Sequence, residues 1–163
     1  MKRLLCTAAL AASASIAATA PALSQDAPVP YPEGYRDWYH VKSMVIEEGH
    51  ALYEAFGGIH HIYANEKAVQ GYRAGVFPDG AVIVFDLLEA HRDDNTLTEG
   101  PRKVAGVMHK DAKAYAETGG WGFEGFAGGD PDSPVVGDQA ESACFSCHLP
   151  MKERDYVFSS LRD

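Results

Sequence analysis

Near its C-terminal end the chain reads Cys144-Phe145-Ser146-Cys147-His148, a CxxCH pentapeptide. Two thiols at this spacing can each form a thioether bond with a vinyl group of one haem, and the adjoining imidazole can ligate the iron. The motif therefore predicts one covalently attached c-type haem. Cys144 and Cys147 are the expected attachment residues, and His148 is the expected proximal ligand of the iron.

Other uses of two nearby cysteines fit the sequence less well. A structural zinc site needs a second Cys/His pair at ligand spacing, and the sequence offers none. A thioredoxin-like redox pair precedes a long helix, whereas this motif lies close to Asp163, the last residue. A structural disulfide is the third alternative, and the histidine directly after the second cysteine favours haem.

Residues 1–22 have the pattern of an export signal. Lys2 and Arg3 precede an apolar run, and Ala20-Pro21-Ala22 forms a small-x-small cleavage site. The run is interrupted by Ser and Thr and is shorter than the roughly 20 residues that a membrane-spanning helix needs. We expect cleavage after Ala22, or at the latest at Gln25. Because c-type haem is attached outside the bacterial inner membrane, we expect a periplasmic protein.

The mature chain is expected to have an extended arm at residues 23–34 and one haem-binding domain at residues 35–163, because no repeat or long linker divides it. Without Lys2 and Arg3 it has 12 basic and 23 acidic residues, a formal charge of −11. This charge argues against binding to nucleic acid or to an anionic membrane. It is compatible with a basic periplasmic redox partner.

The first half of the domain predicts a strand, a helix and a second strand. Residues 58–64 are rich in branched and aromatic side chains, and Asn65 can cap a helix that ends at Gly75. Pro78-Asp79-Gly80 then predicts a turn into residues 81–88, an apolar run of strand length.

The second half repeats this order. Residues 102–109 alternate as in a strand, Asp111 can cap a short helix through Tyr115, and Gly119-Gly120 can end it before a strand at residues 121–126. Such short helices cover one face of a sheet. We therefore expect an α+β fold, a mainly antiparallel sheet with short helices and a C-terminal haem segment.

The sixth position of the iron decides the type of cytochrome. A methionine would give a low-spin electron carrier, and Met44 and Met108 are the candidates, whereas an open position would admit small ligands. His60 and His61 are neighbours, so at most one of them points inward from a strand. We expect this pair to be structural or exposed to solvent.

Aromatic residues are numerous enough to form an apolar pocket as well as a core. The candidates for the distal side of the haem are Phe85, Phe77, Met108 and Phe123, and further aromatic candidates for the pocket are Phe56, Trp121 and Phe126. Glu89 and Glu124 are alternative proton-transfer groups, although surface carboxylates are the usual interpretation.

Several short segments, taken in order, resemble the cytochrome P460 family, which also contains the cytochromes c′-beta. Apart from the pentapeptide, these segments are Tyr35-Arg36-Asp37-Trp38, His61-Ile62-Tyr63-Ala64-Asn65, Phe77-Pro78-Asp79-Gly80-Ala81, Gly119-Gly120-Trp121-Gly122-Phe123 and Asp155-Tyr156-Val157-Phe158. The resemblance implies a homodimer with a mainly antiparallel β fold. It also implies a five-coordinate haem that is open to small ligands.

The sequence departs from this family at one position. In the hydroxylamine-oxidising members a lysine is joined covalently to the haem, and the corresponding position here holds Phe85. No lysine occurs between Ala68 and Pro101, and Lys103 and Lys110 are the nearest substitutes. The resemblance thus implies a c′-beta-like cytochrome that binds NO or CO or exchanges electrons. A hydroxylamine or nitric oxide oxidoreductase with a lysine–haem bond and a six-coordinate electron carrier are the alternatives.

Overall fold

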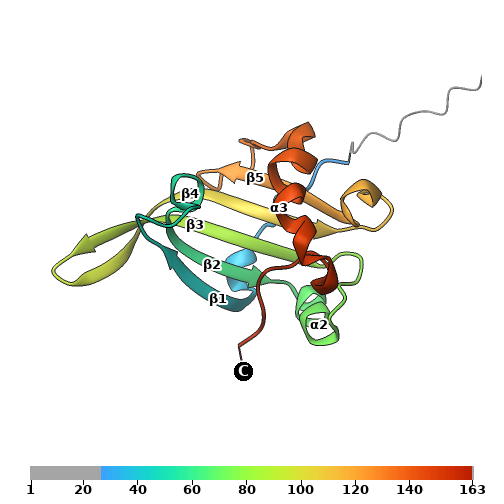
Figure 1. Cartoon of the computed structure of the whole chain (residues 1–163), viewed down its shortest axis with the longest axis horizontal. Helices are drawn as coiled ribbons and strands as arrows, with labels where there is room; N and C mark the ends of the chain where they lie inside the picture. Colours follow the sequence, from blue (N-terminus) through green and yellow to red (C-terminus); the bar gives the residue numbers. More distant parts are fainter. Residues whose placement is uncertain (1–26, 163) are drawn as a thin grey trace, which may run out of the picture.

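One five-stranded antiparallel sheet forms the centre of the computed structural model, which describes residues 27–162 (Figure 1). Each strand pairs with the next one in the chain, in the order β1 (Tyr39–Ile46), β2 (Gly58–Ala64), β3 (Val82–Asp93), β4 (Thr96–Lys110) and β5 (Trp121–Ala127). The α-helices are α1 (Tyr53–Phe56), α2 (Glu66–Ala74) and α3 (Ser146–His148). The 3-10 helices are η1 (Tyr35–Asp37), η2 (Ala116–Thr118), η3 (Gly137–Gln139) and η5 (Leu149–Arg154), and η4 (Glu141–Phe145) is a π-helix. This arrangement confirms the predicted α+β fold class. The predicted signal peptide lies outside the described residues.

The unit β2–α2 begins and ends where local sequence chemistry predicts. Asn65 Oδ1 accepts a hydrogen bond from the Ala68 N–H (2.9 Å), as an N-cap should. The same oxygen accepts from the Val82 N–H (3.1 Å), so Asn65 also fixes the start of β3. Gly75 ends the helix in the left-handed region (φ 79°), which glycine adopts without strain.

The hairpin of β3 and β4 is longer than predicted. Both strands continue beyond the predicted 81–88 and 102–109 to a turn at Asp94 and Asn95, whose positive φ angles (41° and 57°) suit a two-residue hairpin turn. The outer part of the hairpin is exposed and projects from the sheet (Figure 1). Its polar residues on both faces hide the alternation that marks a half-buried strand.

Two further elements were incompletely predicted. Strand β1 was missed because only Val41 and Ile46 of its eight residues are buried, and its pairing with β2 is interrupted between His40 and Lys42. Asp111 does cap a turn, because its Oδ1 accepts from the N–H groups of two following residues, but no α-helix develops before η2.

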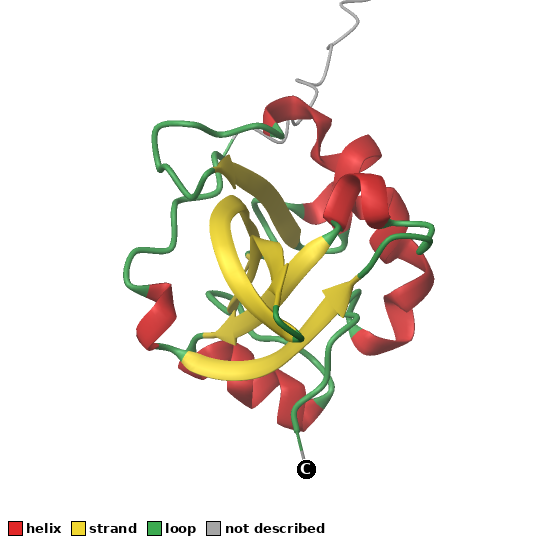
Figure 2. Cartoon of the chain, turned by 90° about the vertical axis from the view of Figure 1, so that its left-hand side faces the viewer, coloured by secondary structure: helices red, strands yellow, loops and turns green. Residues whose placement is uncertain are grey.

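The sheet has an apolar core on each face. One core lies under the C-terminal helices and contains Ile83, Trp121, Phe123 and Phe145. Figure 2 shows these helices along one side of the curved sheet. The opposite core includes Val29, which is buried although it lies in the predicted N-terminal arm. Among the described residues, no helix has the length and apolar character of a membrane span.

Candidate functional site

The CxxCH pentapeptide lies in a continuous helical run formed by η4, α3 and η5. Cys144 and Cys147 are three positions apart, so they lie on neighbouring parts of one helical surface. Cys144 is half-buried and Cys147 is exposed, and both are free thiols. Burial, with smaller contributions from Glu124 and Cys147, raises the pKa of the Cys144 thiol to about 11. Phe145 anchors the run in the core, where it is buried.

His148 is oriented by a hydrogen bond from its ring. Its Nδ1 lies 2.7 Å from the backbone oxygen of Tyr156, and because a carbonyl can only accept, Nδ1 carries the proton. Nε2 therefore holds the lone pair that a metal ligand needs. Burial lowers the pKa of His148 and so favours the neutral imidazole. The ring lies against Phe123 and Phe158, with centroid distances of 5.0 Å and 4.9 Å.

The carbonyl that orients His148 belongs to a tightly held turn. Asp155 and Tyr156 have positive φ angles (50° and 65°), which non-glycine residues seldom adopt. Asp155 fixes this turn to the core, because its Oδ2 accepts from the Phe77 N–H (2.8 Å) and its backbone oxygen accepts from Trp121 Nε1 (2.8 Å). The next carbonyl in the chain, that of Tyr156, accepts the hydrogen bond from His148 Nδ1.

Lys110 completes this support. Its Nζ lies 2.7 Å from Asp155 Oδ1, donates to the Gly119 oxygen (3.1 Å) and faces the Trp121 ring at 5.0 Å. Only 7% of the residue is exposed. Lys110 was a candidate substitute for the cross-linking lysine of the family. In the structure its ammonium group instead forms the ion pair with Asp155, next to the carbonyl that orients His148.

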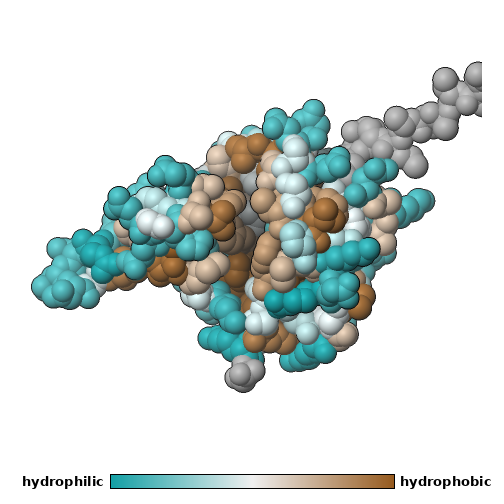
Figure 3. Space-filling model, viewed as in Figure 1, coloured by the Kyte–Doolittle hydropathy of each residue, from teal (hydrophilic) through white to brown (hydrophobic). Residues whose placement is uncertain are grey.

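An apolar hollow lies between the C-terminal helices and α1, over the middle of the sheet (Figure 3). The strand register places two glycines near the Phe85 ring. Gly125 pairs with Gly106, and Gly106 pairs with Phe85, so two glycines lie beside one aromatic ring on the same face. A β-carbon at Gly106 would lie 3.4 Å from the Phe85 ring. Gly106 therefore leaves space beside the Phe85 ring, whereas Gly125 is covered by Val135, whose side chain would lie 3.1 Å from a β-carbon there.

Phe85 and Phe56 form an aromatic wall beside the hollow, and the His60 ring packs against Phe85. The Phe85 ring packs edge-to-face against Phe56 of α1 (5.7 Å) and His60 of β2 (4.5 Å). Phe56 is 40% exposed, whereas His60 is 1% exposed. His60 Nε2 donates to the backbone oxygen of Phe56 (2.5 Å), and burial lowers the pKa of the imidazole. Phe56 was predicted among the pocket aromatics, but no sequence pattern pairs it with Phe85.

The two adjacent histidines point to opposite faces, as predicted. His61 lies on the face opposite His60, where its Nδ1 contacts Ser43 Oγ (2.7 Å) and its Nε2 contacts Glu99 Oε1 (2.6 Å). Both histidines are therefore held by protein partners. Only His60 contacts the wall of the hollow.

The remaining distal candidates occupy different positions. Phe77 is 4% exposed and packs against Trp121 and Tyr72, so it belongs to the core. Phe123 contacts the His148 ring, and Met108 pairs with Phe123 across β4 and β5. Both residues thus lie on the His148 side of the hollow.

The other methionine and lysine candidates, Met44 and Lys103, are both exposed. Met44 is 52% exposed on the edge strand β1, and β2 separates it from Phe85. Lys103 is exposed, and its Nζ donates to the backbone oxygen of Gly57 (2.9 Å), directly after α1. Its ammonium group also lowers the pKa of His60, after the larger effect of burial.

The two carboxylates have structural contacts. Glu124 accepts hydrogen bonds from the N–H groups of Gly125, Val135, Val136 and Gly137, and so holds the loop that leads to the pentapeptide. Glu89 is exposed on the projecting hairpin, where it contacts His91.

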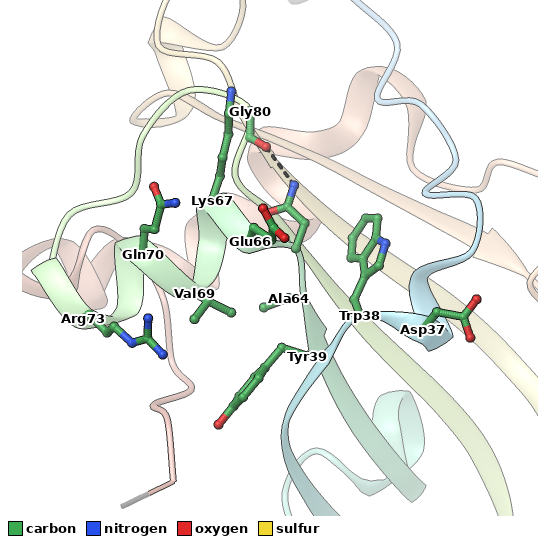
Figure 4. Close-up of a pocket in the computed structure, with 11 residues that line it drawn as sticks. Asp37, Trp38, Tyr39, Ala64, Glu66, Lys67, Val69, Gln70, Arg73 and Gly80 are labelled. Atoms are coloured by element: carbon green, nitrogen blue, oxygen red, sulfur yellow. Dashed lines mark hydrogen bonds between the residues drawn. The ribbon is translucent and has the colours of Figure 1, made fainter.

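A surface pocket elsewhere on the molecule shares none of these residues. It lies between the start of β1 and the side of α2, where Tyr39, Val69 and Arg73 point towards it (Figure 4). The hydrogen bond from Asn65 Nδ2 to the Gly80 oxygen (2.9 Å) closes one side. The pocket is therefore separate from the hollow beside His148.

Comparison with known families gives one result that covers most of the chain. The model of the family described as cytochrome P460 matches residues 32–159, a range that contains the pentapeptide, Phe85, the paired glycines and the turn at Asp155. No curated protein matches the chain significantly. The chain therefore belongs to the cytochrome P460 family.

Proposed function

We propose that this chain is an exported c-type cytochrome that binds small ligands such as NO or CO. Family membership makes haem the cofactor. In this proposal Cys144 and Cys147 hold the haem covalently, His148 ligates the iron, and the opposite face stays open to the ligand. The space that Gly106 leaves beside the Phe85 ring supports the binding of a flat group of this kind.

The asymmetry of the hollow carries the proposal. On one side His148 presents Nε2 as a neutral ligand, fixed by its bond to the Tyr156 oxygen. The other side offers the rings of Phe85 and Phe56, which cannot coordinate iron. His60 lies behind Phe85 and is 1% exposed, so it does not border the hollow. Iron with one open position can bind diatomic ligands or exchange one electron.

The residues of the wall determine what the site can do. Phe85 and Phe56 provide no hydrogen-bond donor to a bound anionic species, but their rings exclude water and limit the volume near the ligand. Steric access, rather than hydrogen bonding, should therefore set the rate of ligand association. This favours reversible binding of NO or CO, or one-electron exchange, over oxidation of hydroxylamine.

Covalent attachment is tested by acid–acetone extraction of the purified protein and by its intact mass. Haem should stay on the polypeptide, and the mass should equal the processed chain plus one haem. Cys144→Ala and Cys147→Ala should each lower the haem-loaded yield sharply. Ser146→Ala, a change at an exposed position inside the same motif, is the matched control. Complete transfer of haem to the organic phase would refute covalent attachment.

One optical spectrum, recorded with and without CO, separates the proposal from its alternatives. The proposal expects high-spin ferrous protein that binds CO. A low-spin ferrous spectrum that CO leaves unchanged, with a methionine signature that is lost in the Met44 or Met108 variant, would establish the six-coordinate electron carrier. A haem peptide that carries Lys103, together with hydroxylamine turnover, would establish the oxidoreductase.

Location and partners are part of the same proposal. The export signal in the sequence and the need to attach c-type haem outside the inner membrane support a periplasmic protein. The mature charge of −11 supports a basic redox partner and argues against nucleic acid and anionic membranes. The family resemblance supports a homodimer.

A further inference from the structure

Helix α1 is a single helical turn, and burial of its own side chains does not fix its position. None of its four residues, Tyr53–Phe56, is buried, and it joins the edge strand β1 to β2. In a short turn of this kind the last carbonyl groups have no partner within the helix. Other parts of the protein must therefore hold α1 in place beside the hollow.

Two side chains from separate strands hold the end of α1. His60 of β2 donates from Nε2 to the Phe56 oxygen (2.5 Å), and Lys103 of β4 donates from Nζ to the Gly57 oxygen (2.9 Å). The backbone that follows has little freedom to move. A β-carbon at Gly58 would lie 2.1 Å from the Leu88 oxygen, which shows how closely this segment approaches β3.

The state of His60 supports a specific role for this contact. Because its Nε2–H donates a hydrogen bond to the Phe56 oxygen, Nδ1 is unprotonated and can only accept. Within residues 27–162 the buried Nδ1 atom has no hydrogen-bond partner. A buried acceptor without a partner lowers stability. An apolar side chain would avoid this cost, but it could not hold the Phe56 carbonyl.

We propose that α1 is a lid on the ligand side of the haem, and that His60 and Lys103 are positioning residues that latch it. This inference rests on the proposed function, because it assigns the Phe56–Phe85 wall to the side where the ligand binds. The latch holds the Phe56 ring edge-on to Phe85. A ligand that enters past these rings needs the lid to shift, so the two hydrogen bonds restrain the rate of entry.

Lys103→Met is the most direct test, because it removes the donor, keeps much of the stem and changes an exposed residue. Lys113→Met, also exposed, is the matched control. The rate of CO association with the ferrous holoprotein should rise roughly threefold to tenfold in Lys103→Met, as expected for the loss of one ordinary hydrogen bond. It should stay at the wild-type value in Lys113→Met. Phe56→Ala should also be fast, and adding Lys103→Met to it should give no further increase.

Hydrogen exchange gives a second measurement that does not depend on ligand binding. Backbone amides of residues 53–57 should exchange faster in Lys103→Met than in the wild-type holoprotein, and they should be unaffected in Lys113→Met. Unchanged CO association and unchanged exchange in Lys103→Met would overturn the latch, as would a covalent bond between Lys103 and the haem. A wild-type protein that binds no CO would instead overturn the proposed function.

Discussion

Replacing Asp155 by asparagine tests the support behind His148. The change keeps the side-chain size and an acceptor for the Phe77 N–H, but it removes the negative charge that lies 2.7 Å from Lys110 Nζ. Breaking a buried ion pair on one side costs about 3–5 kcal/mol. Lys110 keeps its contacts with the Gly119 oxygen and the Trp121 ring, so we expect the lower end of that range, about 3 kcal/mol.

Denaturant unfolding of the ferric holoprotein measures this cost, and a double-mutant cycle assigns it. Lys110→Met removes the cation, so the double variant Asp155→Asn/Lys110→Met should lose less stability than the sum of the two single losses. Glu47→Gln is the control, since its partner Arg92 is 63% exposed and such surface pairs contribute at most about 1 kcal/mol. A loss below about 1 kcal/mol for Asp155→Asn, or strict additivity in the cycle, would refute the reasoning.

Three further results are expected. Phe85→Ala should enlarge the hollow and speed CO and NO association in flash-photolysis or stopped-flow measurements, whereas an unchanged rate would make Phe85 an ordinary core residue. Burial raises the pKa of Tyr72 from 10.0 to about 12, so its contribution to stability is complete below pH 10 and is lost as the pH rises through 12. Denaturation midpoints should therefore fall over this pH window, and less so in Tyr72→Phe. Protein exported to the periplasm should begin between residues 23 and 26 by N-terminal sequencing, and an intact Met1 would contradict the export signal.

Local chemistry explains what the sequence could predict. The pentapeptide predicts haem attachment from five adjacent residues alone, and Asn65 and Gly75 each define an end of α2 by their own side-chain and backbone preferences. Strand β2 was predicted with its observed limits because branched and aromatic side chains predominate in it. These features require no knowledge of distant contacts.

The supports of the site could not be predicted in the same way. Asp155 meets Lys110 from 45 positions away, and Lys103 meets Gly57 from 46 positions away. No periodic pattern or motif links such pairs, because they come together only when the sheet register is set. From the sequence, Lys103 and Lys110 were therefore equivalent substitutes for the cross-linking lysine. In the structure Lys103 donates to the Gly57 oxygen after α1, whereas Lys110 pairs with Asp155.

The two sides of the hollow differ in how firmly they are held. On the His148 side the contacts come from a buried ion pair, a tryptophan N–H and a backbone carbonyl, so a change there should disturb the fold as well as the orientation of His148. On the opposite side a helical turn with no buried residue is held by two side-chain donors. In the proposed cytochrome, substitutions in α1 or at Lys103 should therefore alter access to the iron while His148 keeps its orientation. Ligand kinetics in this protein should thus be tunable at the lid with little loss of stability.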